Sequence, residues 1–335
     1  MNMSLQKQFV KAARNGHLEV VKLLLKDPRV DPSDCYNQAI RYAAMNGHLE
    51  IVELLLTDSR VDPSDDYNLA IRWAARNGRH QVVKLLLNDS RVDPSDNQND
   101  AIQQAVMYGH LEIVELLLKD SRVDPSDADN LAIRWAAQNG DYQVVKLLLA
   151  DSRVDPSDAD NLAIKWAAEN GHLEIVELLL KDDRVDPSDV DNRAIGWAVE
   201  NGHHEIVKLL LTDSRVDPSN DHNLAIRCAA EVGHRHLNVV KLLLEDPRVD
   251  PSDKDNYAIR WAAHNGHLEI VKLLLTDPRV DPGGGNNLAI RWAARKGHLE
   301  VVKLLLKDPR VDPSDDNDAI ILKIKLNILL VLMTI

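Results

Sequence analysis

The chain has 335 residues and a formal net charge of −13, and 28% of its residues are charged while only 4% are aromatic. This acidic balance argues against a nucleic-acid binder, which normally carries a basic face, and against adhesion to anionic lipid. The two cysteines, Cys35 and Cys228, are spaced for neither a disulfide framework nor a metal finger. We therefore expect a reducing, cytoplasmic location.

A repeated segment occupies almost the whole chain. The tripeptide Val-Asp-Pro begins at Val30, Val61, Val92, Val123, Val154, Val185, Val216, Val249, Val280 and Val311. Every interval is 31 residues except one of 33, where two residues are inserted near Arg235. Such a period predicts a repeat architecture, in which each copy buries its apolar side against its neighbours.

Each repeat reads as the same elements in the same order, as in residues 61–91. An Asp-rich segment, called the finger, precedes a first helix predicted over 69–76, whose alanines and isoleucine form an apolar stripe. Asn68 is placed to cap the start of this helix, and Gly78 to end it in a left-handed conformation. A second helix follows, with Val82, Val83 and Leu85 to Leu87 as its buried side.

Along the chain, we expect an N-terminal capping repeat without a finger over residues 1–29. Nine full repeats follow over 30–310, starting at 30, 61, 92, 123, 154, 185, 216, 249 and 280. Residues 311–335 are predicted to form a truncated, apolar C-terminal cap or tail. Its stretch from Ile320 is short for a membrane span and carries two lysines, so a cap is favoured. A membrane anchor, a docking peptide and sequence decay are the alternatives.

The repeats resemble the ankyrin family. "NGHLEIVELLL" (Asn46 to Leu56) is close to the second-helix signature of that family, and "AIRYAAMNGH" (Ala39 to His48) resembles its first helix. The resemblance covers about residues 9–318, although the period is 31 rather than 33 and the Thr-Pro-Leu-His start is missing. It implies an all-α ankyrin-repeat solenoid of stacked helix–turn–helix units with short Asp-rich, hairpin-like fingers. The "DPRVDPSD" fingers and near-identical copies are also similar to ankyrin arrays of large DNA viruses of amoebae.

Two further positions form ladders along the repeats. One ladder is Trp73, Trp135, Trp166, Trp197, Trp261 and Trp292. The other is Arg41, Arg72, Arg134, Lys165, Arg227, Arg260 and Arg291. We expect the tryptophans to lie in the core between first helices, the alternative being a strip for ligand stacking. We expect the basic residues to pair with finger aspartates such as Asp65 or Asp127, the alternative being capture of an acidic partner.

Clusters of acidic residues and histidines raise the question of metals. The finger "DPSDADN" lacks the central Gly and the bidentate Glu of a calcium loop, and its Asp and Ser residues favour turns in any case. The histidines recur once per repeat, such as His17, His48 and His110, too far apart to share one ion. We therefore expect no metal, no cofactor and no small-molecule substrate.

Two positions vary most while the rest of each repeat is nearly uniform. The finger-tip position is filled by Tyr36, Tyr67, Gln98, Asp129, Asp160, Asp191, His222, Asp255 and Asn286. The helix-end position, at the end of the first helix, is filled by Met45, Arg76, Met107, Gln138, Glu169, Glu200, Glu231, His264 and Arg295. In the ankyrin family these positions line the concave groove that grips a partner protein. The repeat starting at Val92 departs most, so Gln103, Gln104 and Tyr108 join Met107 as a candidate focus; drift of that repeat is the alternative.

No nucleophile–base pair, phosphate loop or ligand cluster interrupts the repetition, so we expect a non-catalytic, monomeric scaffold. Its partner is expected to be another protein with a basic or mixed-charge surface, with no nucleic acid and no membrane involved. A viral source would make it a modulator of host processes in the host cytoplasm. The alternatives are a substrate adaptor for a host ubiquitin ligase and a structural or membrane-tethered component that uses the apolar tail.

Overall fold

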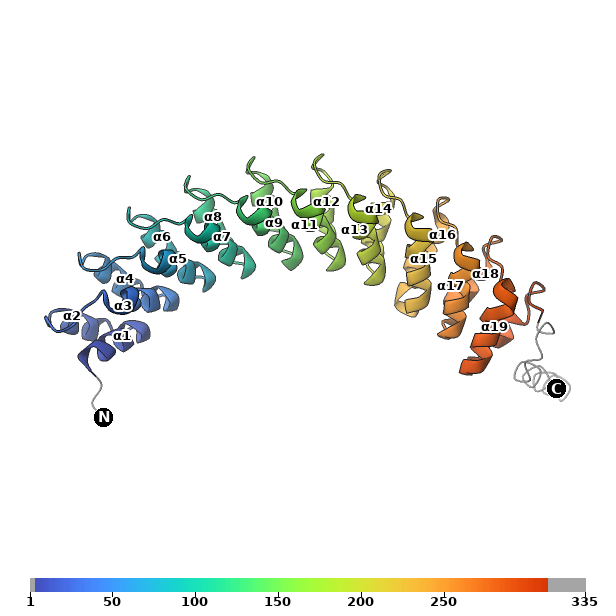
Figure 1. The fold of residues 1–335 in the computed structure, drawn as a ribbon, viewed down its shortest axis with the longest axis horizontal. Coiled ribbons are helices and arrows are strands. Elements are labelled where there is room, and N and C mark those ends of the chain that lie inside the picture. The colour runs from blue at the N-terminus through green and yellow to red at the C-terminus, as the bar shows by residue number, and fades with distance from the viewer. Residues whose placement is uncertain (1–3, 313–335) are drawn as a thin grey trace. The chain divides into compact units, whose positions relative to one another are not determined.

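A computed structural model of the chain describes residues 4–312 (Figure 1). Within that range the regular secondary structure is entirely helical, and the helices alternate between a longer first helix and a shorter second helix. The chain divides into two compact units, Met1–Ala163 and Ile164–Ile335, with the boundary inside the helix α11. Apart from Val311 and Asp312, the tail predicted over 311–335 lies outside the described residues.

The helices follow the predicted period. The first helices are α1 (Leu5–Asn15), α3 (Asp34–Asn46), α5 (Asp65–Arg76), α7 (Asp96–Met107), α9 (Asp127–Asn139), α11 (Asp158–Glu169), α13 (Asp189–Glu200), α15 (Asn220–Val232), α17 (Asp253–His264) and α19 (Gly284–Lys296). The second helices are α2 (Leu18–Leu25), α4 (Leu49–Leu56), α6 (His80–Leu87), α8 (Leu111–Leu118), α10 (Tyr142–Leu149), α12 (Leu173–Leu179), α14 (His204–Leu211), α16 (Leu237–Glu245), α18 (Leu268–Leu275) and α20 (Leu299–Leu305). The two-residue insertion near Arg235 coincides with a short 3₁₀ helix, η1 (His234–His236).

The core lies between neighbouring helix pairs. Ala70, Ile71, Ala74 and Ala75 of α5 are fully buried, as predicted, and α5 packs against α3, α6 and α7. On the second helix, the valines at 82 and 83 and Leu86 are buried, whereas the leucines at 85 and 87 are partly exposed. Small alanine side chains let adjacent first helices approach closely. Within a unit, each helix pair therefore buries its apolar side against the next copy.

The asparagine before each first helix does not act as the predicted N-cap. In α5 the residues Asp66, Tyr67 and Asn68 have φ values of 54–56°, so a short left-handed turn precedes the regular helix. The buried Asn68 reaches into the next repeat, where its Oδ1 accepts from the backbone N–H of Asp93 at 2.9 Å and its Nδ2 donates to Asp96 at 3.0 Å. The same left-handed turn recurs in all nine repeats with a finger, ending at Asn37, Asn68, Asn99, Asn130, Asn161, Asn192, Asn223, Asn256 and Asn287.

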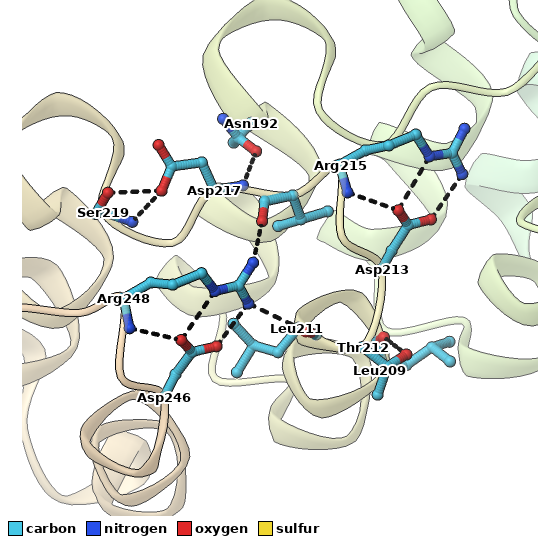
Figure 2. A network of polar contacts seen from close by, with 11 residues as sticks. Asn192, Leu209, Leu211, Thr212, Asp213, Arg215, Asp217, Ser219, Asp246 and Arg248 are labelled. Carbon is cyan, nitrogen blue, oxygen red and sulfur yellow. Dashed lines mark hydrogen bonds and ion pairs between the residues drawn. The ribbon is translucent and has the colours of Figure 1, made fainter.

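The arginine of each finger also holds the finger before it. Figure 2 shows Arg248 forming a bidentate pair with Asp246 while it donates to the carbonyl of Leu211 in the preceding repeat, at 3.1 Å. Arg248 also donates to the carbonyl of Val216, where the preceding finger begins, at 2.7 Å. Asn192 and Ser219 hold the backbone and the carboxylate of Asp217 in the same network. The finger is thus hydrogen-bonded to the neighbouring copy rather than being a free loop.

The Asp–Arg pairs of the fingers predict loss of stability in acid. A hydrogen bond from Arg153 lowers the pKa of Asp151 below its ordinary 3.8, and the pKa of Asp27 falls to about 2 beside Arg29. Because the folded pKa lies below the unfolded one, this stabilisation is complete above about pH 4 and is lost as pH falls through the folded value. Ten such pairs recur at Asp27–Arg29, Asp58–Arg60, Asp89–Arg91, Asp120–Arg122, Asp151–Arg153, Asp182–Arg184, Asp213–Arg215, Asp246–Arg248, Asp277–Arg279 and Asp308–Arg310.

We expect the urea midpoint of unfolding, followed by circular dichroism, to fall steeply between pH 4 and pH 2.5. The Asp151→Asn variant serves as the control, since it lacks one titrating carboxylate and should lose less stability over that interval. An unchanged midpoint at pH 2.5 would contradict this role of the pairs.

Candidate partner-binding surface

Every finger-tip side chain is exposed. Each is the middle residue of the left-handed turn, and the exposed fractions of Tyr36 and Tyr67 reach 71% and 69%. The neighbouring backbone is held in place by the basic ladder, since Arg134 donates to the carbonyl of Ala128 at 2.8 Å and Arg72 to that of Tyr67 at 3.3 Å. The turn therefore fixes the backbone and leaves the side chain at its centre for solvent or a partner.

The helix-end positions are built on the same plan. In the following repeat, the residue just before the second helix contacts the backbone carbonyl of the helix-end residue. His110 lies 3.0 Å from the carbonyl of Arg76, and His203 lies 2.9 Å from the carbonyl of Glu169. Arg79 takes this role toward Met45. The side chains at most helix ends are exposed, while those of Met45, Glu169, Glu231 and His264 are half-buried.

One predicted binding residue is not accessible. Gln103 is only 8% exposed, and its Nε2 donates to the carbonyl of Gln98 at 2.7 Å, at the position where other repeats carry an arginine. Gln104 is half-buried and donates to Asp100. Gln103 thus supports the finger-tip backbone from below. The glutamine makes the same bond to the turn as the ladder arginines do, and the structure places it in the buried frame rather than on the exposed surface.

In the first unit, Arg76 and two residues of the candidate focus, Met107 and Tyr108, are exposed on either side of one repeat boundary. The Arg76 guanidinium lies 5.1 Å from the ring centroid of Tyr108, and Met107 beside it is 44% exposed. Asn139 of the following repeat donates to the Met107 carbonyl at 3.2 Å. An aromatic ring, a thioether and a guanidinium held on a fixed backbone are the side chains most typical of interface hot spots.

A second cluster lies in the other unit, on α17 and α19. The Trp261 ring lies 5.6 Å from Trp292 and 5.5 Å from Tyr257, and His264 fits against both tryptophans at 5.1 and 5.4 Å. Burial lowers the pKa of His264, and the positive charge of Lys296 adds to this. Arg260 lies 6.0 Å from the Trp292 centroid.

The tryptophan ladder is not core. All six tryptophans are half-buried, while the alanines on either side of the first-helix stripe are fully buried. The indoles therefore cover the core from outside and contribute an aromatic edge to the first-helix surface, as the stacked pair of Tyr42 and Trp73 does at 5.9 Å. Neither sequence-based alternative describes this position fully.

The basic ladder is mainly structural, and Arg41 pairs with a finger aspartate as predicted, although not with either of the two named as examples. Asp65 and Asp127 accept from Asn37 and Asn99, respectively. Arg41 pairs instead with Asp66 of the next repeat and donates to its own turn at the Cys35 carbonyl.

The geometry agrees with the sequence comparison. A model of the family described as ankyrin repeats (3 copies) matches seven overlapping segments: 8–66, 40–129, 71–160, 102–191, 133–222, 164–255 and 226–317. The chain belongs to the ankyrin-repeat family. The predicted all-α fold of stacked ankyrin repeats is thereby confirmed. No curated protein sequence matches the chain at a significant level.

Ankyrin repeats generally mediate protein–protein interactions and are typically non-catalytic. Over residues 4–312, no group of three or more His, Cys, Asp or Glu side chains is placed to hold a metal ion. Within the described part of the chain, no helix is long and apolar enough to cross a membrane.

Two sets of inter-repeat contacts were missed by reasoning from the ankyrin sequence pattern. The asparagine bridges and the histidine contacts both join residues 25–36 positions apart. Their recurrence once per repeat was visible, but recurrence alone does not say whether a side chain points to its own copy or to the next.

Proposed function

We propose that this ankyrin-repeat chain is a non-catalytic scaffold that binds a partner protein along the finger-tip and helix-end positions. One observation supports this most: the frame uses its recurring Asn, His and Arg side chains for inter-repeat bonds, and fourteen of the eighteen finger-tip and helix-end side chains remain exposed. The frame, meaning the part of each repeat that is the same in nearly all copies, uses its polar groups for bonds between repeats. The variable positions are therefore the ones available to bind a partner.

The charge of this surface favours a basic or mixed-charge partner. The middle repeats present exposed Asp129, Asp160, Asp191 and Glu200, whereas the Arg76–Tyr108 contact lies toward the N-terminal side. An acidic stretch steers basic partners and rejects acidic ones, so recovery of the partner should fall with ionic strength.

The proposal is tested by affinity purification from lysate with the wild-type chain and a variant carrying Y36A, Y67A, M107A and Y108A. Each truncation removes an exposed hot-spot type of side chain, so recovery of a genuine partner should fall at least about tenfold. Quantitative mass spectrometry of the eluates gives the ratio.

The matched control is Tyr142→Ala, which removes an exposed tyrosine from the second helix α10 instead. It should leave recovery unchanged. Equal recovery of every protein by all three baits would reject the proposed surface.

The narrower roles predicted from sequence stay predictions. Adaptor function and membrane tethering depend on residues after 318, outside the described range, and modulation of a host depends on a viral source. Monomeric state and cytoplasmic location likewise stay predictions.

A further inference from the structure

The repeat that starts at Val185 lacks the ladder cation and has no side chain in its place. Residue 196 is glycine, where the corresponding residue of the repeat that starts at Val30 is Arg41. Arg41 pairs with Asp66 of the following repeat and donates to the Cys35 carbonyl six residues before it. The counterparts of these two acceptors around Gly196 are Asp221 and the carbonyl of Val190, and the side chain that would join them is missing.

The missing side chain leaves a pocket. It lies between α13 and α15, and Ile195, Gly196, Val199, Leu224 and Cys228 contribute to its wall. A Cβ atom added at Gly196 meets nothing within 4 Å. Cys228 widens the pocket further, because it occupies the position that carries tryptophan in six other repeats.

The pocket combines an apolar wall with an acidic rim. Its volume is about 50 Å³, several times the roughly 10–15 Å³ needed to hold one water molecule. Asp191, Glu200 and Asp221 line it together with the apolar side chains, and Leu224 is 39% exposed. An apolar stem that ends in a cation complements such a lining.

We propose that this pocket receives an arginine side chain of the partner protein, which restores in trans the guanidinium that the repeat lacks in cis. The inference rests on the proposed function and names the chemistry of one contact. Arginine is favoured over lysine because its planar fork can donate at once to a carboxylate such as that of Asp221 and to a backbone carbonyl, as Arg41 does with Asp66 and Cys35.

The test uses N-acetyl-arginine methylamide as the probe and the backbone amide NMR signals of Ala225 and Cys228 as the readout. The wild-type chain should show saturable shifts in the millimolar range, as expected for a ligand of this size. The neutral citrulline analogue, which keeps the shape but not the charge, should bind about tenfold more weakly. Equal affinity for the two compounds would overturn the inference.

Gly196→Arg is the decisive variant, because it should fill the pocket from within. The shifts with the arginine probe should disappear, while Tm rises by about 2 °C because arginine is a better helix former than glycine. The added stability rules out misfolding as the cause of lost binding. Gly196→Ala is the control and should keep the probe affinity within about twofold. Unchanged probe binding by Gly196→Arg would overturn the inference.

This outcome is separable from that of the proposed function. In one outcome, the Met107 and Tyr108 changes abolish recovery of the partner, but the chain binds both small compounds equally. This result supports the scaffold function and rejects the arginine pocket. In the other outcome, the chain prefers the arginine probe in the NMR test, but every protein is recovered regardless of those changes. This result supports the arginine pocket and rejects the wider binding surface.

Discussion

Asn130→Ala is expected to lower the free energy of unfolding by about 3 kcal/mol. The Asn130 side chain is 5% exposed, accepts from the backbone N–H of Asp155 at 2.8 Å and donates to Asp158 at 2.9 Å. Its removal leaves the backbone N–H of the half-buried Asp155 and the carboxylate of the half-buried Asp158 without these hydrogen bonds. Alanine also tolerates the left-handed conformation at φ 54° less well than asparagine does. The pKa of Asp158, which the Asn130 bond holds below its ordinary value, should rise.

Urea unfolding followed by circular dichroism measures this effect. Asn77→Ala is the matched control, because Asn77 is exposed and makes one bond, to the carbonyl of Trp73 within its own helix; its loss should cost at most about 1 kcal/mol. Asn130→Gly separates the backbone contribution, since glycine accepts positive φ freely. If Asn130→Ala and Asn77→Ala proved equally mild, the bridge between repeats would not stabilise the array as inferred.

Gly171→Ala is expected to cost about 2–3 kcal/mol, distinctly more than the same change at Gly297. Both glycines end a first helix in the left-handed region, with φ of 81° and 79°. A Cβ at Gly171 would lie 2.7 Å from the His203 ring, whereas one at Gly297 meets nothing within 4 Å. Gly297→Ala therefore carries only the backbone penalty, about 1 kcal/mol. The His203 ring cannot move aside without losing its contact with the Glu169 carbonyl.

Thermal and urea unfolding of the two variants give the comparison, and His203→Ala completes a double-mutant cycle. In the His203→Ala background, Gly171→Ala should cost no more than Gly297→Ala, because the clash is gone. Equal costs of the two glycine changes in the wild-type background would show that the contact between repeats carries no stability.

These two predictions concern the bonds between repeats. The same bonds explain why the side chains of the proposed surface can vary from copy to copy. The histidine at the start of one second helix binds the backbone of the preceding helix end, so that end keeps its position whatever side chain it carries. Arg76 and Glu169 differ in charge and size on this one backbone arrangement, and Asn139 binds the carbonyl of Met107 instead. Variation at such a position changes what is bound without changing the fold.

The sequence by itself determined the repeat, the helix positions and most of the core. A fixed period, the alanine and isoleucine stripe near Ile71 and a glycine such as Gly78 are local signals, because helix propensity and left-handed turns depend on a few adjacent residues. Variation between copies also singled out the finger-tip residues Tyr36 and Tyr67, and both side chains are exposed in the structure.

The tertiary structure alone decided where the polar side chains point. Asn68 was expected to cap its own helix and instead joins Asp93 and Asp96 of the next copy. Gln103 turned inward, and the tryptophans at the Trp73 position settled half-buried outside the alanine core. Each of these outcomes depends on which groups a neighbour some thirty residues away presents, and a polar side chain takes the partner that leaves the fewest buried groups unpaired.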